Sequence, residues 1–135
     1  MSGALDGVRV LDLSTLVQGP QAAAMLHDLG AEVLKIELPE IGDMGRHVGV
    51  IEELGTSVFW EACNRGKRSV TLDLRTDAGR EAFLKLVESS DVVLSNFQPG
   101  TLDGWGLGYD DLAAINPRII WAAGSFLGPT GPDAL

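Results

Sequence analysis

Short apolar segments rich in β-branched residues recur along the chain, and polar residues or glycine separate them. Apolar runs of this length are typical of β-strands that are buried in a sheet. We therefore predict five strands, at Val8–Leu13, Val33–Ile36, Ser69–Asp73, Asp91–Leu94 and Ile119–Ala123.

The segment between the first two predicted strands carries helix signals at both of its ends. Pro20 suits the first helical position, where a backbone N–H has no partner within the helix, and Gly30 suits the left-handed residue that ends a helix. We predict a helix over residues 19–30, and its alanines would allow a close approach to the sheet. The face that packs on the sheet is predicted to contain Ala22, Met25, Leu26 and Leu29.

Two further helices are predicted between the later strands. Thr76–Ser89 begins with a suitable N-cap residue and places Phe83 and Val87 one turn apart, together with Leu86. Asp110–Ile115 is shorter and is closed by Asn116-Pro117. Strands that alternate with helices predict an α/β fold, a Rossmann-like and mainly parallel sheet with flanking helices.

The connection between the second and third strands, residues 37–67, is long for a compact domain and rich in glycine. We expect a functional or interface loop there, with one short helix at Val58–Ala62. At the other end, only a glycine-rich loop follows the last predicted strand. We therefore expect residues 1–135 to be one unit, the N-terminal part of a larger domain.

Composition narrows the possible functions of the chain. The chain has 135 residues, with 10 basic against 19 acidic residues and a formal net charge of −9, which argues against a nucleic-acid surface. One cysteine and two histidines predict neither a disulfide nor a metal site. Because the chain has neither a long apolar run nor a basic-then-apolar leader, we expect a cytoplasmic protein that does not bind membranes.

Five basic side chains fall in one short stretch of this acidic chain. They are either solvated surface charges or a local site for an anionic small molecule. The residues are Arg65, Lys67, Arg68, Arg75 and Arg80.

In open parallel sheets, ligands bind outside the carboxyl ends of the strands. Four predicted loops meet at that edge, at residues 14–20, 37–38, 74–75 and 95–100. The first loop leads directly into a helix N-terminus, whose free N–H groups and positive dipole end favour phosphate or carboxylate. The same arrangement is also how any strand-to-helix unit begins.

Two features of the sequence resemble parts of nucleotide-binding sites, and one further acid lies within a predicted strand. Gly66-Lys67-Arg68-Ser69 is similar to the end of a P-loop, but it precedes a predicted strand, whereas a P-loop follows one. Glu37 occupies the position of a ribose-binding acid, yet the first turn lacks Gly-x-Gly-x-x-Gly, which leaves NAD binding as a weak alternative. Asp12, within the first strand, is either a reactive buried acid or a hydrogen-bonded structural aspartate.

An ordered set of motifs runs through nearly the whole chain. Its segments are Leu5–Leu13, Gly19–Pro20, Asp28–Glu37, Gly42–Arg46, Asn64–Leu74, Asp91–Gly100, Gly106–Tyr109 and Asn116–Arg118. Each segment alone is weak, but in this order they resemble the opening of class III (CaiB/BaiF) CoA-transferases. That family includes formyl-CoA and carnitine CoA-transferases and is related to α-methylacyl-CoA racemase.

The resemblance implies an acyl-CoA enzyme with coenzyme A or an acyl-CoA as substrate and no metal. Its members have a CoA-binding large domain interrupted by a smaller one, and they form interlocked homodimers. In the transferases an aspartate attacks the thioester, forms a mixed anhydride and passes CoA to a small carboxylic acid. That aspartate lies beyond residue 135, so no catalytic residue is expected in this chain, and Asp133 precedes the motif.

The resemblance also implies a set of CoA-binding residues at the sheet edge. The backbone of the first loop would line the thioester and pantetheine, and a second group would border the nucleotide, with Arg75 charged to meet phosphate. A third group would meet CoA through main chain and an apolar wall. These groups are Thr15, Leu16, Val17 and Gln18; Leu72, Asp73, Leu74 and Arg75; and Asn96, Phe97 and Gln98. Leu38 and Gly104 stand where transferases of the formyl-CoA type have arginine.

Three functional hypotheses are compatible with this resemblance, and they differ in the chemistry that they imply. The first is a class III CoA-transferase, and the second is a 2-methylacyl-CoA racemase of the same fold, in which a base pair moves the α-proton. The loop Leu16–Pro20 favours the transferase, because racemases tend to carry an extra glycine there. The third reading is a non-catalytic CoA-binding fragment.

Overall fold

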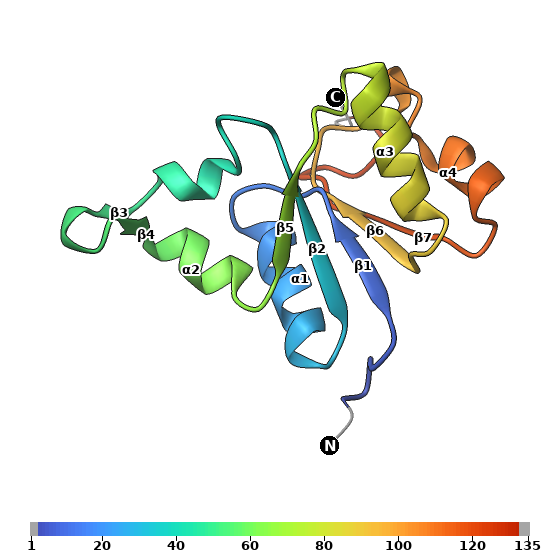
Figure 1. The fold of residues 1–135 in the computed structure, drawn as a ribbon. Coiled ribbons are helices and arrows are strands. Elements are labelled where there is room, and N and C mark those ends of the chain that lie inside the picture. The colour runs from blue at the N-terminus through green and yellow to red at the C-terminus, as the bar shows by residue number, and fades with distance from the viewer. Residues whose placement is uncertain (1–2, 133–135) are drawn as a thin grey trace.

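The computed structural model describes residues 3–132, so Asp133 lies outside the described residues. Its main sheet has five strands in the order β5-β2-β1-β6-β7, and every pairing is parallel (Figure 1). The strands are β1 (Arg9–Asp12), β2 (Glu32–Glu37), β5 (Arg68–Thr71), β6 (Val92–Ser95) and β7 (Ile120–Ala123). The predicted α/β sheet is confirmed, and its strand boundaries shift by only one or two residues.

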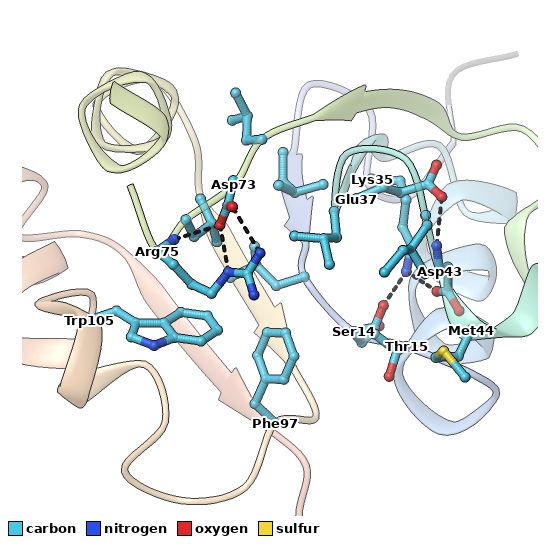
Figure 2. Close-up of a pocket in the computed structure, with 17 residues that line it drawn as sticks. Ser14, Thr15, Lys35, Glu37, Asp43, Met44, Asp73, Arg75, Phe97 and Trp105 are labelled. Atoms are coloured by element: carbon cyan, nitrogen blue, oxygen red, sulfur yellow. Dashed lines mark hydrogen bonds and ion pairs between the residues drawn. The ribbon is translucent and has the colours of Figure 1, made fainter. Parts of the chain in front are cut away.

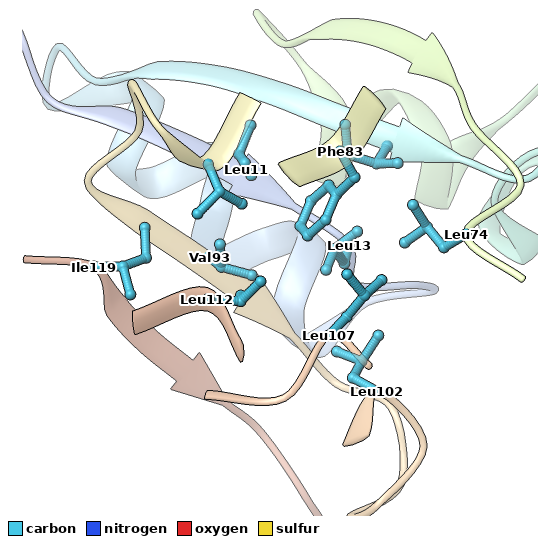
Figure 3. Close-up of a cluster of buried hydrophobic side chains, with 11 residues drawn as sticks. Leu11, Leu13, Leu74, Phe83, Val93, Leu102, Leu107, Leu112 and Ile119 are labelled. Atoms are coloured by element: carbon cyan, nitrogen blue, oxygen red, sulfur yellow. The ribbon is translucent and has the colours of Figure 1, made fainter. Parts of the chain in front are cut away.

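Helices cover both faces of the sheet. Adjacent residues of a strand point to opposite sides, so one strand can contact helices on both faces. Val10 packs with Ala23 of α1 (Gln18–Asp28), whereas Leu11 packs with Phe83 of α3 (Asp77–Val87). The α3 side, which also includes α4 (Tyr109–Ile115), holds the larger cluster of buried side chains (Figure 3). Central strands buried on both faces explain why the sequence shows continuous apolar runs rather than alternation.

Helix α1 differs from its prediction at its start and in its buried face. It begins at Gln18, so Pro20 is the third helical residue, while Gly30 has the expected left-handed φ of 107°. The predicted sheet face is wrong at Met25, which is 56% exposed, and at Leu29, which is 50% exposed. The helix instead lies close to its neighbours through small residues such as Ala23, which is fully buried, and so has no room for long side chains there.

The other two predicted helices are confirmed. Thr76 caps α3 by accepting the N–H of Gly79 at 3.1 Å, and both Phe83 and Val87 are fully buried. Helix α4 starts one residue earlier than expected, and Asp111 accepts the N–H of Gly108 at 3.0 Å.

The long connection between β2 and β5 forms an arm beside the sheet (Figure 1). It contains short 3₁₀ turns at Met44–His47 and Glu52–Leu54, and a small antiparallel hairpin of β3 (Val50–Ile51) and β4 (Thr56–Ser57). The predicted short helix is confirmed as α2 (Val58–Asn64), which packs against α1. None of the helices within residues 3–132 has the length and hydrophobicity of a membrane-spanning segment.

Replacing Gly19 with alanine should destabilise the fold, because α1 begins against the loop after β1. A Cβ at residue 19 would lie 2.2 Å from the Cβ of Ser14. We expect Gly19→Ala to lower the free energy of unfolding by about 1–3 kcal/mol, measured by urea denaturation. Gly104→Ala is the matched control, since a Cβ there has no neighbour within 4 Å. Equal stabilities of the two variants would contradict this account.

Candidate functional site at the carboxyl edge of the sheet

A cleft of about 320 Å³ opens at the carboxyl ends of β1, β2 and β5 (Figure 2). The strand pattern predicted a site at this edge of the sheet. Most of the side chains that line the cleft are apolar. The lining consists of Leu13, Ser14, Thr15, Lys35, Ile36, Glu37, Leu38, Ile41, Gly42, Asp43, Met44, Leu72, Asp73, Leu74, Arg75, Phe97 and Trp105.

The cleft brings together about half of the predicted site residues. Those that line it are Thr15, Leu72, Asp73, Leu74, Arg75 and Phe97. The rest of the first loop, residues 16–18, does not line it, and neither does Asn96. Gln98 instead borders a neighbouring cavity of about 190 Å³, which shares Phe97 with the main cleft. Their contacts with CoA stay predictions.

Two aromatic rings form one wall of the cleft. The ring centres of Phe97 and Trp105 lie 5.8 Å apart, with their planes at 69° to each other. The sequence does not predict Trp105 as a site residue, because nothing in the residues around it indicates that it lies near the other loops. Leu38 also lines the cleft, whereas Gly104 does not. A flat ligand group could pack against this wall.

A cationic group stands beside the aromatic wall. The Arg75 guanidinium is bound by Asp73 through two contacts, Nε to Oδ1 at 2.8 Å and Nη2 to Oδ2 at 2.9 Å (Figure 2). The side-chain hydrogen bond from Arg75 lowers the pKa of Asp73, and the same bond raises the pKa of Arg75. Since these contacts use Nε and Nη2, Nη1 can still meet an anion.

A group of buried charges lies beneath the loop that follows β1. Lys67 Nζ contacts Asp12 Oδ2 at 2.7 Å and donates to the carbonyl of Pro20 at 2.9 Å. Burial lowers the pKa of Lys67, while the Asp12 carboxylate opposes that shift. Asp12 is fully buried and also accepts the N–H of Ser14 at 3.0 Å. These contacts match the structural interpretation of Asp12, and they direct Lys67 away from any phosphate.

Glu37 has all of its hydrogen-bonding capacity in use. Arg46 donates to both of its oxygens at 2.8 Å, and the N–H of Asp43 and the hydroxyl of Ser69 also donate to it. Burial would raise the pKa of Glu37, but the hydrogen bonds from Arg46, Ser69 and Asp43 outweigh it and lower the pKa to about 2. Arg46 in turn lies 3.3 Å above the ring of Trp60. No oxygen is left for a ribose, which removes the main support for the NAD alternative.

The sequence profile of "CoA-transferase family III" matches residues 5–135. The chain belongs to CoA-transferase family III. The resemblance that the motifs indicated is therefore confirmed at the level of the family, and the cleft lies within the matched region.

Several relatives of this family III chain have named activities of their own. It is 45% identical over 128 residues to the succinyl-CoA–D-citramalate CoA-transferase of Chloroflexus aurantiacus, covering 95% of this chain and 32% of that protein. It is 42% identical to the acetyl-CoA:oxalate CoA-transferase of Acetobacter aceti, with 98% and 34% covered. The chain thus spans about a third of the length of the relatives it matches.

A solved structure confirms the fold of this part of the family. The CaiB/BaiF family protein from Brucella suis superposes with a TM-score of 0.91 at 44% identity. The superposition covers 99% of this chain and 36% of that one. The superposed region therefore includes the sheet edge that carries the cleft.

The ionisation of Glu37 should make the free energy of unfolding depend on pH. Its pKa is about 2 in the fold and near its ordinary 4.5 when unfolded, so the unfolded chain binds the proton more readily. The stabilisation is fully present above pH 4.5 and is lost as the pH falls from 4.5 towards 2, by about 3 kcal/mol in all.

Urea denaturation across this range measures the effect. Glu37→Gln should be less stable than the wild type at pH 7 and should lose less stability on acidification. Glu88→Gln, at an exposed carboxylate, is the control and should follow the wild-type profile. Parallel pH profiles for the wild type and Glu37→Gln would refute the role of this carboxylate.

Proposed function

We propose that this chain forms the CoA-binding part of an enzyme that moves CoA from an acyl-CoA thioester to a small carboxylic acid. The observation that carries the proposal is the cleft itself, an apolar pocket with an aromatic wall and one available guanidinium, in a chain of family III. CoA has matching parts, since it joins a flat adenine and phosphates to a long pantetheine arm.

The nucleotide end of CoA is assigned to the side of the cleft near Arg75. The adenine packs against Phe97 and Trp105, where stacking on aromatic rings is favourable. Leu72 and Leu74 border the base, and Arg75 meets a phosphate with the edge that Asp73 does not use. The acidic chain thereby presents a local cation to an anionic ligand.

The thioester end is assigned to the loop Thr15–Gln18, at the start of α1. The first N–H groups of a helix have no acceptor within the helix, and the dipole there favours an oxygen that carries negative charge. Backbone groups can therefore contact the thioester region whatever side chains the loop carries. We assign binding and no covalent step to these residues, because none of the side chains that line the cleft is matched to the attacking aspartate of the family mechanism.

Titration calorimetry with CoA and NADH tests the assignment of the cleft. We expect CoA to bind and NADH to bind far more weakly, because Glu37 is not free for a ribose. We also expect no transferase turnover from the 135-residue protein. Preference for NADH would overturn the CoA assignment, and measurable turnover would overturn the claim that the chain supplies binding alone.

Arg75→Ala tests the predicted phosphate contact. If Arg75 meets the 3′-phosphate, the variant should weaken CoA about tenfold while dephospho-CoA binding changes little, because one charge-assisted hydrogen bond is lost. Arg68→Ala is the control, since Arg68 is an exposed arginine paired with Glu32 at the opposite end of β5. Equal losses for both ligands would argue against this contact.

A further inference from the structure

The backbone of Thr15 is held by one side chain from the loop after β6. Asn96 Oδ1 accepts the N–H of Thr15 at 2.8 Å, and Asn96 Nδ2 donates to the carbonyl of Thr15 at 2.9 Å. The two residues are 81 positions apart in the chain. The side-chain amide of Asn96 is thus engaged with the loop after β1 and does not line the cleft.

The next residue of the same loop is held from another side. The N–H of Leu16 donates to Asp43 Oδ1 at 3.0 Å, and that oxygen also accepts the N–H of Gly45 at 2.6 Å. Asp43 Oδ2 pairs with Lys35 Nζ at 2.6 Å, its only partner among residues 3–132. Lys35 also donates to the carbonyl of Ser14.

These contacts keep the loop in a conformation that it would otherwise leave. Leu16 has a φ of 66°, in the left-handed region, which is unfavourable for a residue with a Cβ. Leu16 is 42% exposed and is not part of the buried core. Three hydrogen bonds to the backbone of Thr15 and Leu16 act against that preference.

We propose that Asn96 is a positioning residue for the thioester end of the CoA site, acting through the backbone of Thr15. This inference rests on the proposed function. The side chain of Asn96 does not touch the ligand; it sets where the N–H groups at the start of α1 point. The nucleotide end of the site, at Arg75, Phe97 and Trp105, is held by other contacts. Asp73 binds the Arg75 guanidinium, and the N–H of Phe97 donates to Ser95 Oγ at 3.2 Å.

Two ligands separate the two ends of the site. CoA uses both ends, whereas adenosine 3′,5′-bisphosphate carries only the nucleotide part. For Asn96→Leu we expect the Kd of CoA to rise about tenfold, or about 1.4 kcal/mol, with the Kd of the bisphosphate unchanged. Amide hydrogen exchange at Thr15 should become faster in the same variant. Asn96→Asp keeps the shape but sets a carboxylate oxygen against the Thr15 carbonyl, and it should also weaken CoA selectively.

Asn116→Leu is the matched control. Asn116 is also a buried amide that holds backbone, donating to the carbonyls of Val87 at 3.1 Å and Ser90 at 2.7 Å, but it precedes β7 at the other end of the strand. We expect this variant to lower the melting temperature and to leave both Kd values unchanged.

The possible outcomes distinguish a failure of the inference from a failure of the proposed function. If the wild type binds CoA but Asn96→Leu and Asn96→Asp leave its Kd unchanged, the positioning role is refuted and the function stands. Equal weakening of both ligands would also refute it, since a general loss of structure acts on the whole cleft. If the wild type binds neither ligand, the proposed function fails and the inference fails with it.

Discussion

A buried ammonium group must be paired, and the way Lys67 meets this requirement organises the candidate site. Its side chain is 2% exposed and reaches Asp12 at the end of β1, the carbonyl of Pro20 in α1 and the side chain of Asn64 in α2. One cation therefore joins three elements beneath the first loop. Removing one partner of such a pair typically costs about 3–5 kcal/mol, because the other charge stays buried without compensation.

A second buried pair extends the same arrangement to the arm. Lys35 and Asp43 join the end of β2 to the segment before the first 3₁₀ turn, and Asp43 holds the Leu16 amide. Glu37 and Arg46 continue this contact to the ring of Trp60 in α2. Paired charges thus attach the arm to the sheet edge, in addition to the packing of α2 on α1, whereas α3 and α4 pack on the sheet through apolar side chains.

The buried charged residues that hold the loop after β1 lie in the motifs that carry the family resemblance. Asp12, Lys35, Asp43 and Lys67 all belong to the quoted motifs, and each contacts another polar group of the protein. They determine the shape of the loop after β1 without contributing a free charge to the cleft. In the proposed CoA site, ligand contacts would then fall to backbone groups, apolar side chains and Arg75.

Local sequence determined the parts of this protein that local physics controls. Apolar run lengths located the five strands, and capping residues such as Thr76 located the helices, because these features act within a few positions of the chain. Motif order then indicated the family, which the profile match confirms.

The tertiary structure decided which distant residues meet. The pairing of Asn96 with Thr15 spans 81 positions, and that of Lys67 with Asp12 spans 55, so no periodicity reports either. Trp105 meets Phe97 across a segment of turns, where no strand or helix period applies. Helix α1 turned Met25 outward because its close contacts leave space only for small residues. The edge that carries the site followed from the strand pattern, whereas the support and shape of the site followed from long-range packing and the pairing of buried charges.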